Sequence, residues 1–396
     1  MLGPGGSLAD LRRDLRDWCA AHVPKEWREQ QRGASHEEMI TFLRWWGGEL
    51  RDAGLSGAHL PKEWGGGYSI AEQIVLAEEL AQGDAPRNAL FHVALYNAAP
   101  TILHSATPEQ RDRFLTGILN GDVWCQGFSE PNAGSDLASL QTRAVRDGDN
   151  YVVTGQKVWT SWARDADWCM LLVRTDPSAP KHKGLSYLVA DMHAPGIEVR
   201  PIKQATGAET FNELFIDELI VPVDQRIGAE NDGWAVAQGT LSSERAIVVL
   251  EMTERLRRNG IAAAVSEAAG WRLESGDPVL SDVATREMFA ECYAEAEVLR
   301  HLLNEMIEDV IRGVDVGGKS AVIKVFYTEL LAKLMREVTG LQGVSAQLDQ
   351  PLLESAGWES GFWMIDYVHS FGWAIGGGTS EIMRNVIGER MLGLPR

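Results

Sequence analysis

Small, hydroxylated and turn-forming residues are concentrated in one segment, residues 124–144, which reads WCQGFSEPNAGSDLASLQTRA. Ser129, Asn132 and Ser135 lie within a few positions of one another there, and Gly134 permits a tight turn between them. Such a turn presents backbone N–H groups to an anion or to the edge of a heteroaromatic ring. The alternative is an ordinary turn-rich connection between strands.

Three tryptophans crowd a second segment, VTGQKVWTSWARDADW, at positions 159, 162 and 168. A tryptophan on a strand usually fills a core. One that lies beside hydroxyl groups, as Trp159 lies beside Thr160 and Ser161, can instead stack on a planar cofactor. The residues alone leave both interpretations open.

Three consecutive glycines, Gly376 to Gly378, precede a helix-compatible run, SEIMRNVIGERML. Glycine permits a positive φ and a close approach of another molecule to the backbone. The run therefore predicts either a helix N-terminal turn or a loop against which a large ligand lies.

A carboxylate and a cation are adjacent in GWAVAQGTLSSERAIVVLEM, whose apolar residues form one helical stripe. At 100° per residue, Glu244 and Arg245 flank this stripe on opposite sides, each about 50° from its centre. Partial desolvation at such an edge raises the pKa of a glutamate towards the range of a general base. The alternatives are a surface carboxylate paired with a cation and, for Arg245, a structural ion pair.

The elements that must position these residues change character twice along the chain. Residues 1–121 have helical spacing with capping signals, residues 122–228 have short β-branched and aromatic runs between turns, and residues 229–396 return to long amphipathic helices. We therefore predict an α+β fold of three domains with these boundaries: a helical domain, a small β barrel or sandwich, and a helical bundle.

Composition limits the possible functions of the 396-residue chain. Its formal charge of −19 argues against nucleic acid as a partner, although one basic pocket for a phosphorylated ligand remains compatible with it. The four cysteines are scattered, which predicts reduced thiols and no metal site. Without an N-terminal apolar region or a long apolar stretch, we expect a cytoplasmic protein with no membrane span.

Three blocks together resemble the signature segments of the acyl-CoA dehydrogenase family: GFSEPNAGSDLASLQTRA, VVTGQKVWTSWARDADWCMLLVRTD and GGGTSEIMRNVIGERMLGLPR. The blocks are long and in the right order, and the resemblance covers nearly the whole chain. It implies an N-terminal helical domain, a central β-barrel and a C-terminal four-helix bundle, with FAD bound between the barrel and the bundle.

The resemblance also implies roles for individual residues. The residues implied to bind FAD are Gln126, Phe128, Ser129, Trp159, Ser161, Thr379 and Glu381. Phe128 and Ser129 would meet the flavin ring largely through backbone groups, with Trp159 packed on the ring and Ser161 near its N5 edge. The residues implied to lie near the acyl-CoA are Ser135, Arg245, Gly376 and Gly377.

The family reaction removes the α proton of an acyl thioester while the β hydrogen leaves as hydride. Many members carry the catalytic glutamate where this chain has Gly377, and others place it on the helix where this chain has Glu244. We expect Glu244 to be the base. Loss of side chains at Gly376 and Gly377 widens the pocket, which suggests a bulky, branched, cyclic or steroid-like acyl group.

Two family elements that reach a neighbouring subunit's FAD are missing. The chain has WRLESGDPVLSD in place of an Arg-x-x-Phe-Gly element, and Glu337 falls roughly where a glutamine is expected. A homotetramer or homodimer and an α2β2 heterotetramer with a homologous subunit are both consistent with this. The expected electron acceptor is an electron-transfer flavoprotein. Alternatives are a non-catalytic subunit, an oxygen-using oxidase or monooxygenase, and a carrier-protein thioester in place of CoA.

Overall fold

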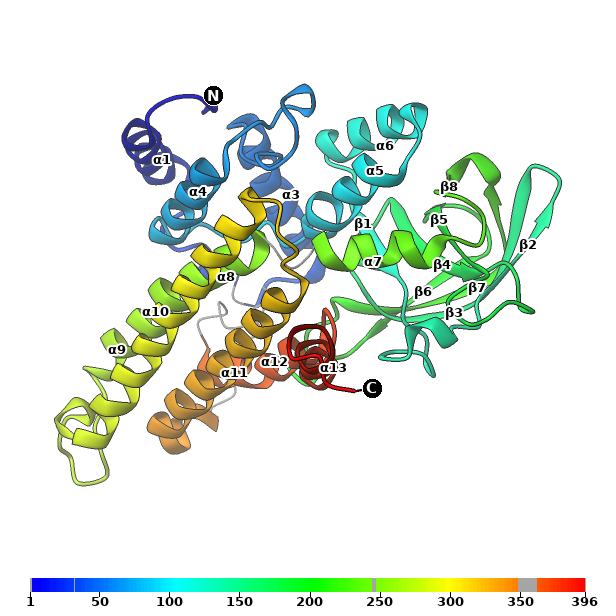
Figure 1. Cartoon of the computed structure of the whole chain (residues 1–396). Coiled ribbons are helices and arrows are strands. Elements are labelled where there is room, and N and C mark those ends of the chain that lie inside the picture. The colour runs from blue at the N-terminus through cyan, green and yellow to red at the C-terminus, as the bar shows by residue number, and fades with distance from the viewer. Residues whose placement is uncertain (1, 32, 244–246, 348–361, 396) are drawn as a thin grey trace. The chain divides into compact units, whose positions relative to one another are not determined.

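The computed structural model describes residues 2–31, 33–243, 247–347 and 362–395 (Figure 1). These residues form two compact units, each built from segments that are distant in the sequence. The sheet unit takes the described residues of Ser35–Gly67 and Asn88–Glu244. The helical unit takes those of Leu2–Ala34, Tyr68–Arg87 and Arg245–Arg396.

An eight-stranded sheet organises the sheet unit, with the order β6–β7–β3–β2–β4–β5–β8 and β1 paired to β4. β1 runs parallel to β4, and the long β3–β7 pair is antiparallel. The strands are β1 (Trp124–Gly127), β2 (Arg143–Asp147), β3 (Asn150–Ser161), β4 (Trp168–Arg174), β5 (Leu185–Asp191), β6 (Ile197–Ile202), β7 (Phe211–Pro222) and β8 (Arg226–Ile227). Alternation along β3 buries Tyr151 and Val153 in the core of this unit.

Helices complete the sheet unit. They are α3 (His36–Asp52), α5 (Ala99–Ser105), α6 (Pro108–Asn120) and α7 (Gly233–Ser243), with the π-helix η2 (Val93–Ala98). The boundaries of α6 follow from its sequence: the Thr107 side chain caps its N-terminus, Pro108 occupies the first turn, and Gly121 ends it with φ 103°. The short 3-10 turns of the sheet unit are η1 (Lys62–Trp64), η3 (Leu137–Ser139), η4 (Ala163–Asp165) and η5 (Val223–Gln225).

The helical unit is a bundle dominated by two long helices, α10 (Val283–Ile311) and α11 (Gly317–Gln342), which lie side by side (Figure 1). Leu303 of α10 and Leu331 of α11 are fully buried. The other helices are α1 (Leu8–His22), α2 (Trp27–Gln31), α4 (Ile70–Gln82), α8 (Ile247–Arg255), α9 (Ala262–Ala268), α12 (Trp363–Ile375) and α13 (Ser380–Val386). Short helical turns are η6 (Leu256–Ile261), η7 (Val279–Ser281), η8 (Gly343–Gln347) and η10 (Ile387–Met391).

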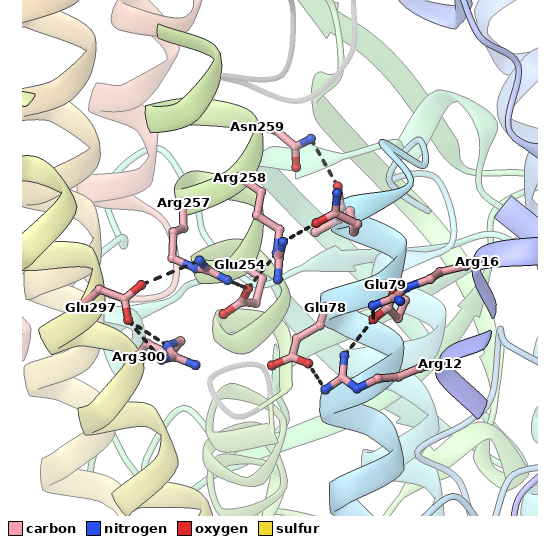
Figure 2. Close-up of polar contacts among 12 residues, drawn as sticks. Arg12, Arg16, Glu78, Glu79, Glu254, Arg257, Arg258, Asn259, Glu297 and Arg300 are labelled. Carbon is pink, nitrogen blue, oxygen red and sulfur yellow. Dashed lines mark hydrogen bonds and ion pairs between the residues drawn. The ribbon is translucent and has the colours of Figure 1, made fainter. Parts of the chain in front are cut away.

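Two buried carboxylates of this unit pair with arginines (Figure 2). Glu79 of α4 accepts hydrogen bonds from Arg12 and Arg16 of α1, each at 2.7 Å. Glu254 at the end of α8 is 1% exposed and pairs with Arg257 and Arg258. The network also includes Glu78, Asn259, Glu297 and Arg300. Because removing one partner leaves a buried charge uncompensated, the Glu79 contacts hold α1 against α4.

Candidate functional site

The predicted ligand-facing turn begins at the end of β1. Gln126 is half-buried, and its Oε1 accepts a hydrogen bond from Asn97 Nδ2 at 3.0 Å. Phe128 is 4% exposed, and its ring meets Tyr187 edge-on at 5.7 Å. The side chain of Phe128 therefore belongs to the core, and only its backbone is available to a ligand.

Backbone carbonyls of this turn are bound by β3. Phe128 O accepts from Lys157 Nζ at 3.1 Å, and Ser129 O accepts from the Val158 N–H at 3.0 Å. The reciprocal backbone bonds between Glu130 and Ala133 then close the turn. The N–H and hydroxyl of Ser129 have no hydrogen-bond partner among the described residues, so they are donors that a ligand can use.

Trp159 is the most unusual residue of β3. Its φ is +62°, in a region that bulky residues rarely adopt, and the β3–β7 register shifts between Lys157 and Thr160. The bulge turns the indole outward, so that Trp159 is 59% exposed, and its ring meets that of Phe211 edge-on. Backbone strain that yields an exposed aromatic face indicates a functional constraint.

The residues after Trp159 add polar groups. Thr160 is fully buried, and its Oγ1 has no hydrogen-bond partner in the described part of the chain. Ser161 is half-buried at the end of β3, and Trp162 repeats the left-handed backbone with φ +60° while packing inside. An exposed indole close to the hydroxyl of Ser161 and to the Ser129 N–H, unpaired within the described chain, fits a planar, hydrogen-bonding group such as a flavin.

Ser135 lies on the surface near a cluster of cations. Its sequence neighbour Asp136 pairs with Lys181 at 2.8 Å, which balances the charge of that carboxylate. Lys181, His182 and Lys183 are consecutive and exposed, and the His182 ring packs edge-on against Trp234. In a chain of charge −19, this segment is a local positive site that suits a phosphorylated ligand.

In the helical unit, the glycine run is the turn between α12 and α13. Gly377 and Gly378 have φ values of +65° and +98°, which only glycine adopts without strain. Thr379 then caps α13 by accepting from the Ile382 N–H at 3.2 Å. Glu381 is exposed in the first turn, and hydrogen bonds from the helix N-terminal backbone and Thr379 lower the pKa of its carboxyl.

Several residues near these elements were not anticipated from the sequence. Lys157 and Glu130 form a buried ion pair behind the turn after β1. Lys324 of α11 donates to the carbonyl of Ala374 at 3.2 Å, just before the glycine run. The burial of Lys157 was predictable from the sequence, because period-two alternation from Tyr151 and Val153 puts this residue on the inner face of β3.

Glu244 and Arg245, the expected base and its neighbour, lie outside the described residues, between α7 and α8. The described residues hold no group of three or more His, Cys, Asp or Glu side chains that could bind a metal. Within the same residues, no helix is long and apolar enough to cross a membrane.

Family models match almost the whole chain. The models of the N-terminal, middle and C-terminal domains of acyl-CoA dehydrogenase cover residues 7–122, 125–219 and 231–392. The three matches confirm the family resemblance and the order of helical, sheet and helical parts.

Similar proteins and a solved structure point to the same family as these models. Acyl-CoA dehydrogenase FadE34 of Mycobacterium tuberculosis is 40% identical over 355 residues, which are 88% of this chain but only 46% of that protein. Acyl-CoA dehydrogenase IpdE1 of the same organism is 35% identical over 401 residues, 98% of each chain. A solved structure described as the Tcur3481–Tcur3483 steroid ACAD superposes with a TM-score of 0.84 and 32% identity over 98% of each chain.

Proposed function

Because the chain belongs to the acyl-CoA dehydrogenase family of oxidoreductases, whose members use a flavin, we propose that it binds FAD and oxidises an acyl-CoA to the trans-2-enoyl-CoA. The main observation behind this proposal is the exposed side chain of Trp159. A 59% exposed indole on a left-handed backbone is costly for an isolated protein and becomes useful when a flat ring system covers it.

The residues proposed to bind FAD are those that the family resemblance implies. The Ser129 N–H and hydroxyl, with Gln126 and the Phe128 backbone beside them, hydrogen-bond the ring, Trp159 stacks on it, and Ser161 lies at its N5 edge. Thr379 and Glu381 face the adenosine part. When bound, FAD supplies the acceptor for the β hydrogen, which leaves the substrate as hydride.

Glu244 is the proposed base. It removes the α proton of the thioester, a task for a carboxylate whose pKa is raised in a dry pocket. The position that carries the base in many family members is Gly377, which has no side chain to do this. Arg245, its neighbour, would hold part of the CoA.

The CoA portion has a matching surface on the sheet unit. Ser135 binds it, and the exposed segment of Lys181, His182 and Lys183 meets its phosphates. Because Lys181 pairs with Asp136, the charge of the carboxylate next to Ser135 in the sequence is balanced, and Lys183 adds a further positive charge for a phosphate.

The acyl group is proposed to be bulky, branched, cyclic or steroid-like. Gly376 and Gly377 leave the site without side chains on the turn before α13. The similarity to a structure described as a steroid ACAD supports a ring-bearing acyl group for this chain as well.

The assembly we favour is an α2β2 heterotetramer with a homologous subunit. The Tcur3481–Tcur3483 structure carries two protein names, and this chain lacks both elements that would reach a neighbour's FAD. Glu337 pairs with Arg336 at 2.7 Å, and a carboxylate there would repel a pyrophosphate. An electron-transfer flavoprotein is the proposed acceptor, in the reducing cytoplasm that the four unpaired cysteines suit.

The test is a visible spectrum of the purified chain, followed by anaerobic addition of steroid-like and straight-chain acyl-CoAs. We expect bound FAD to bleach with the bulky thioester in wild type and about a thousandfold or more slowly in Glu244→Gln, since the base is lost. Glu274→Gln, which removes an exposed carboxylate of the helical unit, is the matched control and should bleach at the wild-type rate.

Flavin that stays oxidised with every thioester would contradict catalysis by this chain and favour a non-catalytic subunit. Faster bleaching with straight-chain thioesters would refute the bulky acyl group. Rapid reoxidation by oxygen in the presence of product would identify an oxidase instead.

A further inference from the structure

Lys157 is a fully buried lysine on β3, two residues before Trp159. Lysine is almost never fully buried unless its charge is paired, because desolvating an ammonium is costly. Its position therefore needs an explanation beyond strand propensity.

All three ammonium protons of Lys157 are used. Nζ donates to Phe128 O at 3.1 Å, to Leu172 O at 2.7 Å and to Glu130 Oε1 at 2.9 Å. The lysine thus connects the turn after β1, strand β3 and strand β4 from inside the sheet unit.

Glu130 completes this buried pair. It is 8% exposed, and it also accepts the N–H of Thr142 at 2.8 Å and that of Gln141 at 2.6 Å. Burial alone would raise the pKa of Glu130, but Lys157 and these amides outweigh it and lower the pKa. The carboxylate is charged at neutral pH and fully satisfied.

The contact with Phe128 has a geometric consequence. In a trans peptide, the C=O of one residue and the N–H of the next point in opposite directions. When Lys157 holds the Phe128 carbonyl, it also directs the Ser129 N–H away from the buried pair. That N–H is one of the donors left without a partner in the described chain.

The same lysine borders the bulge of β3. The register shift begins at Lys157 and ends at Thr160, and the Val158 N–H binds Ser129 O inside it. The side chain of Lys157 therefore binds the peptide that carries the Ser129 amide, and its backbone begins the bulge that carries Trp159.

We propose that Lys157, neutralised by Glu130, is a positioning residue that sets the peptide plane of Phe128–Ser129 and the bulge carrying Trp159 for flavin binding. The proposal rests on the proposed function for the identity of the ligand. The competing explanation is that the pair only balances charge inside the sheet unit.

The test compares Lys157→Met, Glu130→Gln and the double variant. Lys157→Met alone leaves a buried carboxylate without its cation, which is strongly destabilising and uninformative about flavin. The double variant removes both charges but still lacks the donor to Phe128 O. It therefore separates charge balance from positioning.

Two properties of the double variant are measured, FAD binding and hydrogen exchange. We expect FAD to bind the flavin-free protein about tenfold more weakly than in wild type, with a shifted visible spectrum, because the Ser129 donor is no longer oriented. Hydrogen exchange without flavin should be faster in peptides covering 126–134 and 156–162, and unchanged in α10 and α11 as internal controls.

Wild-type affinity, spectrum and exchange in the double variant would overturn the proposal and leave charge balance as the role of the pair. If wild type alone binds no FAD, the cofactor site needs the homologous subunit that we favour, and FAD affinity is then measured in the assembled complex; a complex that also binds no FAD contradicts the proposed function. Exchange in the two peptides still decides whether Lys157 orders these segments, since that readout needs no flavin.

Discussion

At the residue scale, side chains that the sequence marks as chemical are presented by backbone features that the sequence does not show. Trp159 is exposed because a β-bulge and a left-handed φ turn it outward, whereas Trp162 has the same φ and packs inside. Phe128 is a core side chain that leaves only its backbone to a ligand. Residue type alone did not predict which of these three side chains is exposed and which are buried.

The strain at Trp159 leads to a prediction. Trp159→Gly and Trp159→Ala both remove the indole, but only glycine relieves the φ of +62°. In flavin-free protein we expect the glycine variant to be more stable than the alanine variant by about 1 kcal/mol.

Chemical unfolding of the two variants measures this difference, and both should bind FAD more weakly than wild type. Equal stability of the pair would show that the bulge relaxes without cost. Wild-type FAD affinity in both would remove Trp159 from the cofactor site.

At the element scale, the glycine run is explained by the turn between two helices. α12 ends at Ile375, its last carbonyls accept from Lys324 Nζ and the Gly376 N–H, and α13 begins after the Thr379 cap. The sequence indicated a helix start here. It did not show which of the three glycines the backbone requires.

The structure distinguishes the glycines and predicts the effect of substituting them. A Cβ on Gly378, at φ +98°, would lie 2.6 Å from Met383 Cε. We expect Gly378→Ala to cost about 1–2 kcal/mol of stability. The matched control is Gly376→Ala, where φ is −62° and the nearest atom is 3.5 Å away.

Gly376→Ala should change stability by less than about 0.5 kcal/mol, measured by denaturant unfolding. A larger loss in Gly376→Ala than in Gly378→Ala would mean that the turn has a different backbone conformation.

At the scale of the whole molecule, segments from both ends of the chain build the helical unit. Residues 68–87 pack with the C-terminal helices, where the Arg87 guanidinium lies 5.5 Å from the centre of the Trp373 ring. His369 lies on the same helix as Trp373 with its Nδ1 buried. Burial, with repulsion by Arg87, lowers the pKa of His369 from 6.5 to about 4.

This pKa predicts acid sensitivity. Below pH 6.5 the unfolded chain binds a proton at His369 that the folded chain does not bind until about pH 4. Stability is therefore lost as the pH falls from 6.5 to 4, by at most about 3 kcal/mol. The Tm of His369→Gln should fall less over this range than that of wild type.

His301→Gln, which changes an exposed histidine on α10, is the control and should follow the wild-type pH profile. Parallel profiles for His369→Gln and wild type would contradict a neutral, buried His369.

The sequence by itself determined the family and the order of helical and sheet parts, because periodicity, caps and turn residues act over a few positions. The three-domain boundaries, the base Glu244 and the ligand residues stay predictions. Only the tertiary structure decided that Lys157 and Glu130 meet behind the turn after β1, that Trp159 faces outward, and that Arg87 reaches Trp373. These contacts join residues far apart in the chain, and their burial and pairing depend on how strands and helices pack rather than on any local pattern.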